Sequence, residues 1–115
     1  MWDKRAEYLG NRDGNNVKLV LDQGFGDTKL VDIRLLGVYA PELSEKGGPE
    51  CKEFVAKWFE AHDTDTTRWR FIVTTSSLKD TDRYVGIITD IGIESNLNAE
   101  LTEFIHANGY GETGS

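Results

Sequence analysis

Hydrophobic and polar residues alternate in two runs near the start of the chain, as in strands that bury one face. The runs cover 17–22 and 31–36, and a glycine-rich segment at 23–27 separates them. A period of two places successive side chains on opposite faces of a strand, and glycine permits the positive φ angles of tight turns. We therefore predict an antiparallel hairpin with Arg34 on its polar face, preceded by a weaker strand at 7–12.

The middle of the chain changes from a period of two to helical spacing. Pro49 suits the first position of a helix, and Glu50 favours the positive end of the helix dipole. Apolar residues at i, i+3, i+4, i+7 and i+8 then form the stripe of a helix that faces a core. This pattern predicts a helix from Pro49 to about His62, with the stripe Cys51, Phe54, Val55, Trp58 and Phe59. We expect Cys51 in the core rather than as a nucleophile.

A second helix is predicted near the end of the chain. Ser95 and Asn96 are both good N-caps, and Gly109 stands where a C-terminal glycine cap is expected. The apolar stripe between them is Leu97, Leu101, Phe104 and Ile105.

Two strands are predicted between the helices, which completes the order β-β-β-α-β-β-α. β-branched and aromatic residues favour strands at 69–75 and 84–90. One face of the second of these strands carries Val85, Ile87 and Thr89. Five short strands with a helix after the third are typical of a small OB-type barrel, a mainly β fold of the α+β class. We expect one domain over 1–115, with its core at about 5–109 and a tail at 110–115.

Composition and charge exclude several classes of protein. The chain has 115 residues, a net charge of −7 and a single cysteine. An acidic domain is a poor candidate for broad binding to phosphate backbones, and one cysteine excludes an internal disulfide and a thiolate-rich zinc site. No apolar run reaches the roughly 18–20 residues of a transmembrane helix, and the first residues lack the apolar core of a signal peptide. We expect a soluble, cytoplasmic protein that does not bind membranes.

Five short motifs add a family resemblance. They are Asp-Gly-Asn-Asn-Val-Lys-Leu at 13–19, VDIRLLGVYAPE at 31–42, Gly-Pro-Glu at 48–50, Asp-Arg-Tyr at 82–84 and Leu-Asn-Ala-Glu-Leu at 97–101. In this order and spacing they resemble the staphylococcal-nuclease (thermonuclease) family. The resemblance implies a five-stranded OB barrel with helices. It also implies phosphodiester hydrolysis by a metal-assisted water, with carboxylates that hold Ca2+ and arginines that stabilise the charged transition state.

Two residues match positions that carry this chemistry in the family. Arg34 matches the arginine that binds the phosphate, and Glu42 matches the catalytic glutamate after the proline. Without the resemblance, Arg34 is a solvent-facing strand residue and Glu42 is a turn residue. With it, the two are candidate catalytic residues, and Arg83 and Tyr84 of the Asp-Arg-Tyr motif are candidate substrate-binding residues.

Three other positions depart from the family. Asn15 stands where the resemblance implies a metal-binding aspartate, and its amide carries no charge, which weakens Ca2+ binding. Tyr39 replaces a second aspartate with a poor Ca2+ ligand that is bulky enough to occupy the metal's space. Asp13 lies nearby, but these changes leave no confident metal site. The second catalytic arginine has no equivalent, because Val85-Gly86 stands where the family has Gly-Arg.

The histidines and strand aromatics have structural explanations as well as functional ones. His62 and His106 lack the spacing of a metal-binding pair, so we expect surface or capping roles. Trp69, Phe71 and Tyr84 suit a platform for stacking bases, but aromatic residues are also ordinary strand core, and we favour the core.

Two functions remain open at this stage. We favour a nuclease-like domain that has lost catalysis and acts as a binding or structural module without a cofactor, since losing a single charge-stabilising donor costs about 100–1,000-fold in rate. Its partner would be a protein or weakly bound single-stranded nucleic acid. The alternative is a divergent metal-dependent nuclease that hydrolyses DNA or RNA with Arg34, Glu42 and Ca2+. The resemblance also implies a third helix, for which the residues after Gly109 are too few, and a domain of this kind would suit a bacterial or phage genome.

Overall fold

The computed structural model describes residues 2–62, 69–76, 83–90 and 95–110. The loop predicted after the first helix, most of the loop before 83 and the tail after 110 lie outside these ranges. The elements are β1 (Trp2–Asn11), β2 (Asn16–Gly24), β3 (Asp27–Leu35), α1 (Gly48–His62), β4 (Phe71–Ser76), β5 (Arg83–Asp90), β6 (Ser95–Asn96) and α2 (Leu97–Asn108).

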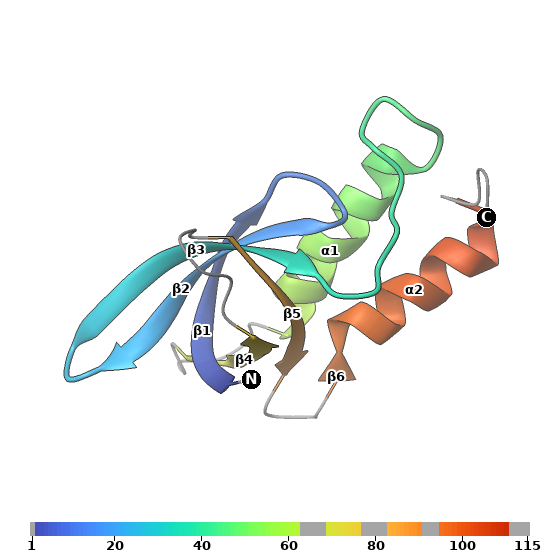
Figure 1. The fold of residues 1–115 in the computed structure, drawn as a ribbon. Helices are drawn as coiled ribbons and strands as arrows, with labels where there is room; N and C mark the ends of the chain where they lie inside the picture. Colours follow the sequence, from blue (N-terminus) through green and yellow to red (C-terminus); the bar gives the residue numbers. More distant parts are fainter. Residues whose placement is uncertain (1, 63–68, 77–82, 91–94, 111–115) are drawn as a thin grey trace.

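Five of the strands close into a barrel, which confirms the predicted OB-type architecture with two helices (Figure 1). The sheet runs in the order β3-β2-β1-β4-β5-β6, and a further pairing joins β3 to β5. That closing pair is parallel, from Asp32 opposite Arg83 to Leu35 opposite Gly86, whereas the other pairs are antiparallel. The predicted hairpin is formed by β2 and β3.

β1 is longer than the predicted weak strand at 7–12. It pairs with β2 on one side and with β4 on the other, so hydrogen bonds from both neighbours hold a segment whose own sequence is highly charged. The register shifts between Tyr8 and Gly10, which marks a bulge. The two-residue β6 was not predicted, because it is too short to show a period.

The core fills the barrel and the face of the two helices that covers it. α1 buries most of its predicted stripe, and its Phe59 stacks on Tyr8 of β1 with ring centroids 4.0 Å apart. Phe54 and Phe104 stack at 4.6 Å and join α1 to α2. The largest fully buried side chains are Phe59, Phe71, Leu19, Leu21, Ile33, Leu35, Ile88, Leu97, Leu101, Val17, Val31 and Val38. None of the helices in the described ranges is long and apolar enough to cross a membrane.

The caps of α2 form as predicted. The Asn96 side chain accepts a hydrogen bond from the backbone N–H of Ala99 at 3.1 Å, and Gly109 takes a left-handed conformation with φ of 66°. Asn96, rather than Ser95, is therefore the N-cap. α1 begins one residue before Pro49, at Gly48.

The interior face of β5 is not the one suggested by its β-branched residues. Tyr84, Gly86, Ile88 and Asp90 are buried, whereas the face with Val85, Ile87 and Thr89 is only half-buried. The pattern misleads because a glycine and an aspartate occupy two interior positions. Position 86, where the resemblance implies a second arginine, therefore faces the interior.

Candidate functional site

Arg34 lies on the outward face of β3, near the end of the strand. Its neighbours Ile33 and Leu35 are buried, whereas Arg34 is exposed, as the alternation predicts. Asn16 of β2 is opposite Arg34, and Val85 of β5 lies beside it. Within the described ranges the guanidinium forms no ion pair, so it is available to a ligand in solvent.

Asn15 lies in the turn between β1 and β2 and joins that turn to the loop after β3. Its Oδ1 accepts a hydrogen bond from the N–H of Ala40 at 3.0 Å, and its Nδ2 donates to the carbonyl of Ala40 at 3.3 Å. Its own carbonyl accepts from the N–H of Leu35 at 2.8 Å. An amide offers a donor and an acceptor, whereas an ionised carboxylate only accepts. An ionised aspartate at position 15 cannot reproduce both bonds to Ala40.

The carboxylate of Asp13 is engaged within the same turn. Its Oδ1 accepts from the N–H of Asn15 at 2.8 Å, from the N–H of Asn16 at 2.9 Å and from the Nδ2 of Asn16 at 3.0 Å. This local pattern is one by which aspartate stabilises turns. Across the described ranges, no three His, Cys, Asp or Glu side chains are grouped so that they could hold a metal ion.

Tyr39 is directed to solvent from a well-anchored loop. Its neighbours Val38 and Ala40 are buried, whereas Tyr39 is 73% exposed. Its ring therefore lies at the surface of the loop rather than in the interior. Two other large apolar residues of this loop, Leu36 and Leu43, are also exposed.

Glu42 follows in the same loop with its side chain exposed. Its backbone N–H donates to Oε1 of Glu45 at 2.8 Å, and its carbonyl accepts from the N–H of Glu45 at 2.9 Å. Gly48 packs so closely on this carbonyl that a Cβ there would overlap it. The main chain of Glu42 is thus fixed, and its carboxylate is exposed.

The bonds of Asn15 bring the candidate positions into one region of the molecule. Through Leu35 they join the turn to the end of β3, next to Arg34, and through Ala40 they join it to the loop that carries Tyr39 and Glu42. The turn, the end of β3 and the loop therefore meet at a neutral amide.

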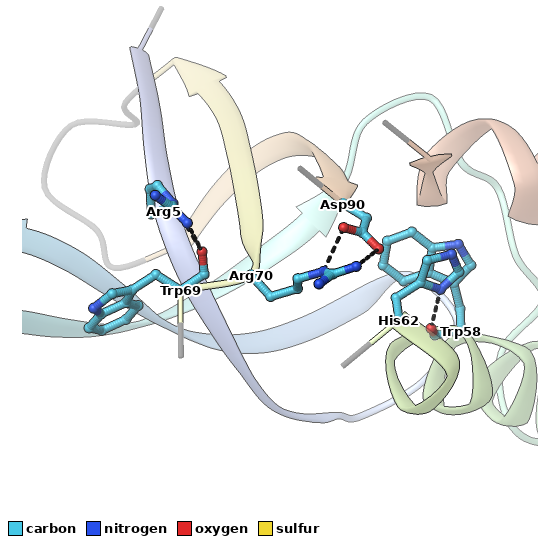
Figure 2. A network of polar contacts seen from close by, with 6 residues as sticks. All are labelled: Arg5, Trp58, His62, Trp69, Arg70 and Asp90. Atoms are coloured by element: carbon cyan, nitrogen blue, oxygen red, sulfur yellow. Dashed lines mark hydrogen bonds and ion pairs between the residues drawn. The ribbon is translucent and has the colours of Figure 1, made fainter. Parts of the chain in front are cut away.

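Tyr84 and Phe71 belong to the core, as expected, rather than to an open stacking platform. Tyr84 is 7% exposed and its hydroxyl accepts from Nζ of Lys29 at 3.1 Å, while Phe71 is 1% exposed. Trp69 is half-buried, and its carbonyl accepts from the guanidinium of Arg5 (Figure 2). Arg83 pairs within the barrel through its backbone, and its side chain lies outside the described structure.

Gly86 has no room for a side chain. A Cβ at this position would lie 2.9 Å from the carbonyl oxygen of Thr74 and 2.9 Å from Cβ of Thr75. The carbonyl of Gly86 accepts hydrogen bonds from the N–H of Leu36 at 2.8 Å and from Nδ2 of Asn98 at 3.0 Å. An arginine here would require β4 and β5 to separate.

A second close junction surrounds the thiol of Cys51. A Cβ at Gly14 would lie 2.8 Å from Cβ of Cys51 and 2.9 Å from Cβ of Ala40, so turn, loop and α1 meet without spare space. Burial raises the pKa of the Cys51 thiol to about 11, and the nearby charge of Glu50 adds to this effect. The thiol is fully buried and protonated at neutral pH, which confirms its place in the core.

A buried ion pair joins the start of β4 to the end of β5 (Figure 2). Nε of Arg70 donates to Oδ1 of Asp90 at 2.8 Å, and the Asp90 side chain is fully buried. Figure 2 also shows the stacked rings of Trp58 and His62 on α1, whose centroids are 4.2 Å apart. A carboxylate removed from water needs a charged or hydrogen-bonding partner. We assign this cluster a structural role.

A cleft that sequence reasoning missed opens on the outer face of β1 and β2. Its volume is about 380 Å3, and it is lined by Gly10, Asn11, Arg12, Asn16, Lys18 and Asp32. The sequence feature that could have indicated this cleft is Gly10, because a glycine inside a strand often marks a bulge or an open surface.

Comparison with known proteins assigns no family. No protein-family model matches the chain, and no curated protein matches it. The closed barrel and the positions of the candidate residues are therefore the structural basis for a functional proposal.

Proposed function

We propose that the chain is a thermonuclease-like barrel domain that binds a partner without hydrolysing phosphodiesters. The observation that carries this proposal is the pair of hydrogen bonds between Asn15 and Ala40. Both polar atoms of the side chain that replaces a metal-binding aspartate are used by the fold, and the substitution therefore has a structural purpose of its own.

The position of the second arginine supports the same conclusion. Gly86 faces the interior and lacks space for even a Cβ. An arginine cannot occupy this position unless β4 and β5 rearrange. Loss of one preorganised charge-stabilising group typically costs about 100–1,000-fold in rate.

The charge and surface of the candidate region favour a protein partner. Leu36, Tyr39 and Leu43 are 50%, 73% and 42% exposed on a loop whose backbone is anchored by hydrogen bonds. Exposed apolar side chains on a fixed backbone lose little entropy on binding, and tyrosine is common in binding hot spots. The net charge of −7 opposes an extended nucleic-acid strand.

A cleavage assay tests the proposal directly. Single-stranded and duplex DNA incubated with the protein and Ca2+ should remain intact, and Glu42→Ala should behave as the native chain does. Ca2+ should leave the melting temperature unchanged, since an ion that binds the native state would raise it. Ca2+-dependent cleavage that Glu42→Ala abolishes would instead establish the divergent nuclease with Arg34 and Glu42.

A further inference from the structure

The cleft between β1 and β2 results from two local features of the strand pair. The bulge between Tyr8 and Gly10 shifts the register, and Gly10 then lies directly opposite Lys18. Because Gly10 has no side chain, the residue directly opposite Lys18 does not cover its stem. A Cβ at Gly10 would meet no atom within 4 Å, so the space is open rather than tightly packed.

The charges around this cleft are unusual for so acidic a chain. Arg12 and Lys18 line it together with a single acidic residue, Asp32. Within the described ranges, neither Arg12 nor Lys18 forms an ion pair, and both are exposed. The planar fork of an arginine and the point charge of a lysine are the usual partners of a phosphate group.

The backbone that carries these groups is held in place before any ligand binds. The N–H of Arg12 donates to the carbonyl of Asn16 at 3.0 Å, which closes the turn. Nδ2 of Asn11 donates to the carbonyls of Asp13 and of Lys52 on α1, both at 3.0 Å. The three donors on the Asp13 carboxylate also reduce its repulsion of an anion. Such preorganisation lowers the entropic cost of binding.

We propose that this cleft binds a small phosphorylated molecule, such as a nucleotide or a sugar phosphate. Arg12 and Lys18 contact the phosphate, and Asp32 accepts a hydrogen bond from a hydroxyl or amino group of the same molecule. The volume of about 380 Å3 lies within the range of small-molecule sites, roughly 300–1,000 Å3. A long polyanion is disfavoured by the net charge of −7. The cleft adjoins Arg34, because its lining residue Asn16 pairs directly with Arg34 across β2 and β3, but Arg34 does not line it. The proposal does not depend on the proposed function.

Isotope-edited NMR titrations at fixed ionic strength test this site. The probes are inorganic phosphate, a nucleoside 5′-monophosphate and a twelve-nucleotide single-stranded DNA. The monophosphate should shift the amide signals of 10–18 and bind at least about tenfold more tightly than inorganic phosphate, because it also reaches Asp32. If the monophosphate and inorganic phosphate bind with equal affinity, the cleft recognises only the phosphate group, and the proposed role of Asp32 is wrong.

Matched variants distinguish binding in the cleft from a general effect of the protein's charge. Arg12→Ala and Lys18→Ala should each weaken monophosphate binding at least about tenfold. Lys57→Ala, which removes an exposed lysine on α1, should not change it. Gly10→Val should fill the cleft, weaken binding and leave the melting temperature unchanged or higher, since valine favours strands.

Three results would overturn the proposal. The first is the absence of amide shifts at 10–18 with the monophosphate. The second is binding that Arg34→Ala abolishes while Arg12→Ala leaves it intact, which would place the ligand at the candidate catalytic position. The third is binding of the oligonucleotide more than about tenfold tighter than the monophosphate, which would indicate a strand rather than a small molecule.

Discussion

Replacing Asn15 by aspartate tests whether the amide is a structural link between the turn and the loop. In Asn15→Asp at pH 7, the carboxylate still accepts from the N–H of Ala40, but the donor to the Ala40 carbonyl at 3.3 Å is lost. A carboxylate oxygen then faces that carbonyl oxygen. A half-buried acceptor left without its donor costs about 1–3 kcal/mol. We expect a loss of this size, which corresponds to about 4–12 °C in melting temperature for a domain of this length.

The assay is urea unfolding of the native chain and of Asn15→Asp, followed at pH 7 and at about pH 3.5. Gln23→Glu is the matched control, because it also converts an amide to a carboxylate, on an exposed side chain near the end of β2. At low pH the introduced carboxyl group is protonated and its hydroxyl can donate to the Ala40 carbonyl, so the stability difference between Asn15→Asp and the native chain should shrink. The reasoning is refuted if Asn15→Asp and Gln23→Glu unfold at the same urea concentration at pH 7.

Three further predictions concern the core. Arg70→Met removes the charged partner of the buried Asp90 carboxylate and should cost about 3–5 kcal/mol in urea unfolding. Adding Asp90→Leu should restore much of this loss, and an Arg70→Met variant as stable as the native chain would contradict the prediction. Gly14→Ala places a Cβ 2.8 Å from that of Cys51 and should cost about 1–3 kcal/mol, which differential scanning calorimetry would measure. Burial raises the pKa of the Cys51 thiol from an ordinary value of 9.0 to about 11. Between these two pH values the thiol keeps its proton in the native state and loses it in the unfolded chain. The stability of the native chain relative to Cys51→Ala should therefore fall as pH rises from about 9 to about 11, and a constant difference would refute the burial effect.

The fold was predictable wherever one face of an element is clearly apolar. The period of two at 17–22 and the stripe on α1 identify their elements without help from distant residues. The length of β1 was underestimated, because its own sequence does not show that it pairs with both β2 and β4. On β5, the burial of Gly86 and Asp90 depends on β4 and Arg70, so a local pattern of β-branched residues pointed to the wrong face.

The interactions of the candidate site residues could not be predicted from the sequence. Strand alternation predicted the exposure of Arg34, yet the partner of the Asn15 amide lies 25 residues away in sequence. The closed space at Gly86 is set by Thr74 and Thr75 on another strand. The cleft at Gly10 arises from a register shift, which single-strand alternation cannot reveal.

Two strand pairings close the barrel over long stretches of chain. The β1–β2 and β2–β3 pairings join segments close in sequence, whereas Ala6 pairs with Phe71, 65 residues further on, and Asp32 pairs with Arg83, 51 residues further on. Closing so long a segment of chain is slow, because its entropy is lost before the contacts are gained. We expect both long-range pairings, β1–β4 and β3–β5, to form after the hairpins. Substitutions that weaken them should accelerate unfolding, so the lifetime of the native barrel depends on these two pairings.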